Sequence, residues 1–177
     1  MSLKLIWLSG WASSGKDTAA EVLCAAGAKK LAFADSLKDM VAEKYGFPRH
    51  WCDSVEGKAT VISEEGISVR ELLIKDSFEA KKQDVNVFAR IVFEKILNEF
   101  VKGTKIIVIS DWRFPHEYHF VTGATAGIQP ITVRITRPGL EPLTDDSEHQ
   151  LDLWDFNEYI ENNVLEDFQN RVAKILD

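Results

Sequence analysis

Short apolar runs of strand length alternate along the chain with longer segments whose apolar residues recur at helical spacing. The clearest strand is Lys105–Ser110, because an unbroken β-branched run is typical of a parallel strand buried on both faces. The pattern predicts further strands at Leu3–Ser9, Lys30–Ala34, Ile131–Ile135 and Glu158–Ile160. Strands that alternate with helices predict an α/β fold, with a parallel sheet of these five strands, right-handed crossovers and helices on both faces.

The predicted helices occupy the segments between the strands. They cover about residues 19–26, 35–45, 68–80, 87–102 and 164–176. Ser68 and Glu71 have the spacing of a capping box, which supports a helix start there. The helix over 87–102 carries one broad apolar stripe that we expect to face the core: Phe88, Ile91, Val92, Ile96, Leu97 and Phe100. The polar residues 49–67 give no clear element, and a chain of 177 residues favours a single domain, 1–177.

A loop with the spacing of a phosphate-binding motif joins the first strand to the first helix. It reads Gly10, Trp11, Ala12, Ser13, Ser14, Gly15, Lys16, Asp17 and Thr18. In such a loop backbone N–H groups point at phosphate oxygens, the helix N-terminus adds partial positive charge, and the lysine reaches the β- and γ-phosphates. The usual Ser or Thr after the lysine is replaced here by Asp17. A glycine turn that binds nothing is the alternative, but the position between strand and helix favours nucleotide binding.

Composition restricts the partners that we expect. Hydrophobic residues make up 45% of the chain and charged residues 28%, as in ordinary globular proteins. A net charge of −7 argues against polymeric nucleic acid or an anionic membrane as a partner. The two cysteines, Cys24 and Cys52, form no CxxC pair, and no apolar run approaches the ~20 residues of a membrane span. We therefore expect a cytoplasmic protein. The sequence is compatible with either a monomer or a homodimer.

Polar side chains follow several predicted strands at the carboxyl end, where ligands bind in open parallel sheets. Asp35 and Lys38 follow the second strand, and Asp111 and Arg113 follow Lys105–Ser110. Arg137 and the segment Asp145-Asp146-Ser147-Glu148 follow the fourth strand. Carboxylates and cations that converge on one edge suit phosphoryl transfer, which needs a metal, charge clamps and positioning.

Each of these residues has a functional and a structural interpretation. Asp111 can hold Mg²⁺ directly or through water, or it can cap a helix or turn. Arg113 can clamp a transferring phosphate with its planar donor fork, or form a surface salt bridge. Asp35 can orient the phosphate or hydroxyl that accepts the phosphoryl group, or it can cap the next helix. Lys38 can contact an acceptor phosphate, or it can remain a solvated lysine on the helix surface. Arg70 opens a predicted helix, where a cation opposes the helix dipole, and this hints at an anionic ligand.

Five segments of the chain, in this order, resemble the deoxynucleoside monophosphate kinases of bacteriophages and related viruses, a branch of the P-loop kinases. They are residues 10–18, with the Gly-Lys-Asp-Thr ending; 33–38, Phe-Ala-Asp-Ser-Leu-Lys; 70–73, Arg-Glu-Leu-Leu; 110–117, Ser-Asp-Trp-Arg-Phe-Pro-His-Glu; and 147–148 with 160–163. The resemblance implies a P-loop NTPase-type sheet, an acceptor-binding helical region at about 36–100 and a lid at about 137–156.

The resemblance further implies transfer of the ATP γ-phosphate to a (deoxy)nucleoside monophosphate with Mg²⁺, in the host cytoplasm if the protein is viral. It implies that Lys16 binds the β- and γ-phosphates, that Thr18 binds the α-phosphate, and that the rest of the loop contacts the donor. Mg²⁺ contacts would come from Asp17, through water, and from Asp111. The acceptor would be surrounded by Asp35, Lys38, Arg70 and Arg113. Arg137 would clamp the donor phosphates from the lid, and Glu117 would orient Arg113 or cap its helix.

Departures from the family pattern leave the acceptor open. Ser36 stands where relatives often have Pro, and Ile74 and Asp76-Ser77 stand where Gln and a Gly-Thr pair are common. One alternative keeps the fold and the donor but uses another phosphorylated metabolite, of the phosphomevalonate or dephospho-coenzyme A type. The other alternative is a nucleotide-binding module without transfer, which a second anion site would disfavour.

Overall fold

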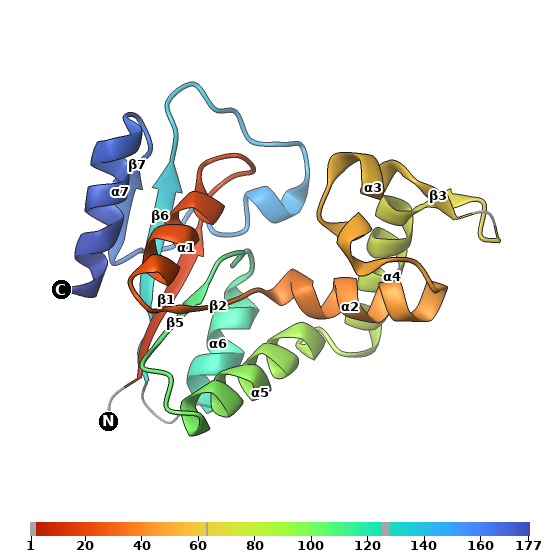
Figure 1. Cartoon of the computed structure of the whole chain (residues 1–177), viewed down its shortest axis with the longest axis horizontal. Helices are drawn as coiled ribbons and strands as arrows, with labels where there is room; N and C mark the ends of the chain where they lie inside the picture. The colour runs from red at the N-terminus through yellow and green to blue at the C-terminus, as the bar shows by residue number, and fades with distance from the viewer. Residues whose placement is uncertain (1–2, 63, 125–127) are drawn as a thin grey trace.

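A five-stranded parallel sheet forms the centre of the protein. A computed structural model describes residues 3–62, 64–124 and 128–177. The strands lie in the order β2-β5-β1-β6-β7, and all four neighbouring pairs are parallel (Figure 1). Their bounds are β1 Lys4–Ser9, β2 Lys29–Leu31, β5 Ile106–Ile109, β6 Ile131–Thr136 and β7 Glu158–Glu161. The predicted parallel α/β sheet of five strands is confirmed.

Helices cover both faces of this sheet. Successive residues of β1 point to opposite faces, so Ile6 and Leu8 pack on one side and Leu5 and Trp7 on the other. The first side is covered by α1 (Lys16–Ala25) and α7 (Leu165–Ala173), the second by α5 (Val87–Val101) and α6 (Pro115–Ala124) (Figure 1). The stripe on α5 is narrower than predicted: Phe88, Val92 and Ile96 are buried, whereas Leu97 and Phe100 are largely exposed.

A helical region stands beside the sheet with a small core of its own. It contains α2 (Phe33–Tyr45), the 3-10 helix η1 (Arg49–Cys52), α3 (Val55–Ala59) and α4 (Val69–Gln83) (Figure 1). An antiparallel pair, β3 (Val61–Ile62) and β4 (Ile67–Ser68), precedes α4. The core of the helical region consists of Val41, Ala42, Phe47, Cys52, Val69 and Leu72. The capping box predicted at Ser68 and Glu71 is present.

Two predicted boundaries need correction. The second strand ends at Leu31, and Phe33 and Ala34 belong to the first turn of α2, because the distant Asp111 carboxylate accepts their backbone N–H groups. The C-terminal helix α7 ends at Ala173 and continues as the 3-10 turn η3 (Lys174–Leu176). Sequence analysis assigned no element to α6, to the turn η2 (Asp146–Glu148), or to η1, α3, β3 and β4 within the polar stretch 49–67 and its end.

No described helix is long and apolar enough to span a bilayer.

Candidate active site

The phosphate-type loop joins β1 to α1 at the carboxyl edge of the sheet. Its backbone has positive φ at Gly10 (151°), Ser13 (65°) and Gly15 (113°). A Cβ on Gly10 would lie 2.4 Å from the carbonyl oxygen of Ile135, which belongs to a neighbouring strand. A Cβ on Gly15 would lie 2.4 Å from the side-chain Nδ2 of Asn162. Both positions therefore require glycine for the loop to close against β6 and the residue after β7.

Gly10→Ala is expected to destabilise the protein, because the added methyl group meets a backbone carbonyl in a φ region that L residues avoid. The expected loss is at least about 2 kcal/mol in the free energy of unfolding, measured with urea, together with loss of ATP binding. Gly123→Ala in α6 is the matched control, since its Cβ would meet no atom within 4 Å and its φ is not in the positive region. Equal stability of the two variants would contradict the close approach at Gly10.

Lys16, the first residue of α1, lies folded against the loop. Its Nζ donates to the carbonyl oxygens of Gly10 and Trp11, each at 2.7 Å. Burial, and then the nearby charge of Arg113, lower the pKa of Lys16 to about 8. A phosphate group in the loop would offset both effects, because an anion favours the charged form of the lysine.

A cavity of about 540 Å³ opens between this loop and the helical region. Its charged lining consists of cations and carboxylates: Lys16, Lys30, Lys38, Lys58 and Arg113, with Asp17, Asp35, Asp53 and Asp111. Burial, and then the charges of Lys38 and Arg70, lower the pKa of Lys58. Clustered cations of this kind suit a ligand that carries several negative charges.

The cavity brings together most of the residues that the sequence selected. Asp35, Lys38, Asp111 and Arg113 line the same cavity as Lys16. Arg137 does not line it. It is exposed in the turn after β6, where its carbonyl accepts from Leu140 N and the chain bends away at Pro138–Gly139. Arg70 is exposed on the first turn of α4, close enough to Lys58 to affect its pKa.

Asp111 links the end of β5 to the start of α2. Its two carboxylate oxygens accept from Phe33 N (2.8 Å) and Ala34 N (2.9 Å), so it caps a helix that lies 77–78 residues earlier in the chain. Burial raises the pKa of Asp111, and these two hydrogen bonds oppose the rise. The capping interpretation of Asp111 is therefore present in the geometry, and its role toward a metal stays a prediction.

Arg113 and Glu148 form a contact that sequence reasoning did not identify. The Nη1 of Arg113 donates to Glu148 Oε1 at 2.6 Å and to Ser147 Oγ at 2.9 Å. The other oxygen, Glu148 Oε2, accepts from Ala12 N in the phosphate-type loop at 2.7 Å. The sequence signals were the acidic segment after β6 and the resemblance at residues 147–148, but neither indicated a contact with Arg113.

Glu117 is buried at the start of α6 and accepts from the backbone N–H groups of Arg113 (3.2 Å) and Phe114 (3.1 Å). It thus contacts the backbone at Arg113 and caps the first turn of α6, and the family resemblance implied one or the other of these roles. Burial, and then the neighbouring Asp111, raise the pKa of Glu117 to about 8.

Glu117→Gln is expected to remove part of the stability loss of the wild type between about pH 5 and pH 8. The folded protein holds a proton on Glu117 that the unfolded chain releases above its usual pKa of 4.5. This contribution is complete below that value and is lost as the pH rises to about 8, on the order of a few kcal/mol. The titration of Lys16 changes the free energy of unfolding only above about pH 8, because its pKa in the folded protein is lowered to about that value. Urea unfolding at both pH values measures the effect, and the same slope in both proteins would contradict it.

A second cavity of about 120 Å³ adjoins the first. It shares Ala34, Asp111 and Arg113 with the larger cavity and extends beyond them. Its remaining wall combines aromatic and aliphatic groups with a few polar ones: Phe33, Leu37, Phe88, Phe114, Ser77, Lys81 and Glu117. The Nζ of Lys81 lies 4.2 Å from the centre of the Phe114 ring. A flat ring with polar edges fits such a lining.

Three charged residues that line the larger cavity were not selected by the sequence analysis: Lys30, Asp53 and Lys58. Asp53 bridges two cations of the helical region, because its carboxylate accepts from Lys38 (2.9 Å) and from Arg49 (2.8 Å). Burial opposes ionisation of Asp53, but these bonds outweigh it and lower its pKa. Asp53 and Lys58 lie in the polar stretch 49–67, where no pattern indicated an element.

The donor set fits a magnesium ion bound largely by phosphate and water. No group of three His, Cys, Asp or Glu side chains that could hold a metal occurs among the described residues. Mg²⁺ usually binds proteins through one or two carboxylates and takes its other ligands from phosphates and water. Asp17 has such a carboxylate, since its side chain is 83% exposed and its contact with Lys30 (2.9 Å) uses only Oδ1.

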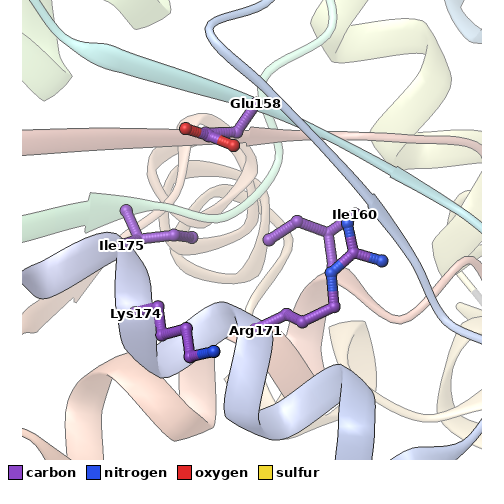
Figure 2. A pocket seen from close by; sticks show the side chains of 5 residues that line it. All are labelled: Glu158, Ile160, Arg171, Lys174 and Ile175. Atoms are coloured by element: carbon purple, nitrogen blue, oxygen red, sulfur yellow. The ribbon is translucent and has the colours of Figure 1, made fainter.

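Another cavity, of about 250 Å³, lies between β7 and the end of α7, and its lining includes Glu158, Ile160 and Arg171 (Figure 2). Glu158 begins β7, so this cavity adjoins the amino end of the strand. The phosphate-type loop adjoins the opposite end, because Asn162, just after β7, donates to Ser14 O. This cavity is therefore separate from the candidate active site.

Comparison with known proteins shows a shared fold. No protein-family model and no curated protein sequence matches the chain. Among solved structures, TT1252 from Thermus thermophilus is similar with a TM-score of 0.55 and 16% identity, over 99% of this chain and 97% of that one. Dephospho-CoA kinase from Campylobacter jejuni is similar with a TM-score of 0.51 and 17% identity, over 97% and 94%. The chain shares the fold of these two proteins, a parallel α/β sheet with helices on both faces. Identities this low establish the fold alone.

Proposed function

We propose that this protein is an ATP-dependent kinase of a small phosphorylated acceptor, and specifically of a (deoxy)nucleoside monophosphate. The observation that carries the proposal is the shared cavity, which is lined by Lys16 of the phosphate-type loop together with Asp35, Lys38 and Arg113. A protein that only senses a nucleotide has no need of this second cationic cluster. In-line transfer between two phosphates needs two such anion sites on one cavity.

On the donor side, the loop N–H groups and Lys16 bind and orient the triphosphate. Asp17, through water, and the carboxylate of Asp111 would hold Mg²⁺, which neutralises phosphate charge when it is bound. Arg113 lies between the two sides and stabilises charge on the transferring group. Thr18, in the first turn of α1, would bind the α-phosphate. Arg137 would have to move from its exposed turn to reach the donor.

On the acceptor side, Lys38, Lys58 and the nearby Arg70 would attract the acceptor phosphate, while Asp35 orients it. The small cavity beyond Arg113, with its aromatic wall, would take a nucleobase. Of the departures from the viral kinases, only Ser77 lines this cavity. Ser36 accepts from Lys95, Asp76 from Lys44 and Tyr45, and Ile74 is exposed.

Another phosphorylated acceptor is the second candidate, and the shared fold with the Campylobacter jejuni dephospho-CoA kinase favours it. A coupled assay for ADP with purified protein, MgATP and a panel of acceptors separates the two. The panel contains the common ribo- and deoxyribonucleoside monophosphates, dephospho-coenzyme A and phosphomevalonate. ADP formed only with a monophosphate nucleotide supports the first candidate. ADP formed only with another acceptor replaces it, and ATP binding without turnover on any acceptor contradicts kinase activity.

A further inference from the structure

The carboxylate of Glu148 is placed between the phosphate-type loop and Arg113. Its side chain is only 1% exposed, and its two oxygens serve different partners. Oε1 accepts from Arg113 Nη1 at 2.6 Å and Oε2 from Ala12 N at 2.7 Å. We infer that Glu148 is a positioning residue for phosphoryl transfer, which fixes the Arg113 guanidinium beside the donor loop. The inference rests on the proposed function.

The energetics of burial explain why one residue would do this. A carboxylate removed from water is costly unless a charge and further hydrogen bonds compensate it. Glu148 has one ionised partner and one backbone N–H donor, so its carboxylate is held at the position where it contacts both. Without Glu148, the only remaining hydrogen bond of the Arg113 side chain within the described residues is the one to Ser147 Oγ. A long arginine side chain with one neutral partner loses a defined orientation.

Arg113 keeps donors for a ligand while it is held. Both hydrogen bonds from its guanidinium in the described part of the chain use Nη1, which leaves Nε and Nη2 for other acceptors. The side chain is 37% exposed and lines both cavities. Glu148 therefore occupies only the Nη1 donor of the guanidinium, and the Nε and Nη2 donors can contact the transferring group.

The segment that carries Glu148 is itself anchored. After β6 the chain passes over the edge of the sheet and descends between it and the helical region (Figure 1). Asp145 accepts from Ser147 N at 2.8 Å and caps the turn η2. Asp152 accepts from Arg134 Nη2 at 2.6 Å, and Arg134 is a buried residue of β6 that also donates to Ser9 Oγ. These contacts place the carboxylate before any substrate arrives, which is what preorganisation requires.

The test is a double-mutant cycle with Glu148→Gln and Arg113→Ala, on the acceptor that the panel identifies. Gln cannot accept at both ends, so kcat should fall by about 10²-fold, while KM for ATP changes by less than about threefold. In the Arg113→Ala background the same change should have less than about a twofold further effect, because Glu148 acts through Arg113. Glu148→Asp keeps the buried charge but is too short to span both partners, so it should lower kcat in the same background-dependent way. Glu94→Gln, at an exposed position on α5, should leave activity unchanged.

Two kinetic outcomes would overturn the inference. An equal loss in both backgrounds would show a structural role, and a lower KM for ATP with kcat unchanged would show that Glu148 competes with phosphate. If the wild type phosphorylates no acceptor, the proposed function fails, and NMR of the arginine Nε–H groups still tests the contact. The Arg113 signal, identified by its loss in Arg113→Lys, should shift and broaden in Glu148→Gln. An unchanged signal would overturn the inference independently of activity.

Discussion

Lys16→Met should reduce phosphoryl transfer by at least about 10³-fold, because it removes the one cationic side chain of the loop that we propose binds the donor phosphates. Lys16 lies at the loop and lines the larger cavity. Methionine retains much of the stem but cannot neutralise the β- and γ-phosphates. Initial rates of ADP formation at saturating acceptor, with ATP affinity from calorimetry, measure the loss.

The pH dependence of ATP binding gives a second measure for the same variant. The pKa of Lys16 is lowered to about 8 by burial and Arg113, so its ammonium form declines as the pH rises above that value. ATP affinity of the wild type should therefore fall above about pH 8, and that fall should be absent in Lys16→Met. Lys75→Met, at an exposed position on α4, is the matched control and should behave as the wild type. Turnover of Lys16→Met within tenfold of the wild type would contradict the assignment.

The sheet and the donor loop could be predicted from the sequence because both depend on local patterns. β5 is an apolar run buried on both faces, and the loop spacing is fixed by the backbone turns at Gly10 and Gly15. The boundary between β2 and α2 could not be predicted, since the cap on α2 comes from Asp111 far along the chain. Local letters favoured a longer strand, and a tertiary hydrogen bond decided otherwise.

The site was predictable only in part, for a similar reason. Residues that directly follow a strand reach the carboxyl edge, and Asp111 and Arg113 do so. Arg137 also follows a strand, but the turn at Pro138–Gly139 carries it to the surface. Glu148 is brought to the loop by a return of the chain that no periodic pattern marks, and it meets Arg113 across 35 residues.

Hydrogen bonds around Arg113 connect the end of β5, the turn η2, α6 and α2 at one site. Glu117 holds its backbone N–H, Glu148 holds its guanidinium, and Asp111 two residues earlier holds the start of α2. Three acidic side chains thus fix the strand end, the arginine and α2 relative to one another. A guanidinium held in this way in a partly dry cavity can stabilise a developing charge without reorganising, as the proposed phosphoryl transfer requires.

Arg113→Ala should lower kcat by about 10²- to 10³-fold, equivalent to about 3–4 kcal/mol, with ATP affinity nearly unchanged. The guanidinium lines the larger cavity, which we propose holds both phosphates, and also the smaller cavity, so its loss should affect the transferring group more than the bound donor. The variant also leaves the buried Glu148 without a cation, and this should reduce the free energy of unfolding. Arg113→Lys keeps that charge pair but not the planar fork, and should restore stability more than activity. Arg90→Ala, which removes an exposed pair with Asp84, is the control and should leave kcat unchanged. An equal loss of ATP affinity in the Arg113→Ala and Lys16→Met variants would place Arg113 on the donor side alone and contradict its role between the two phosphates.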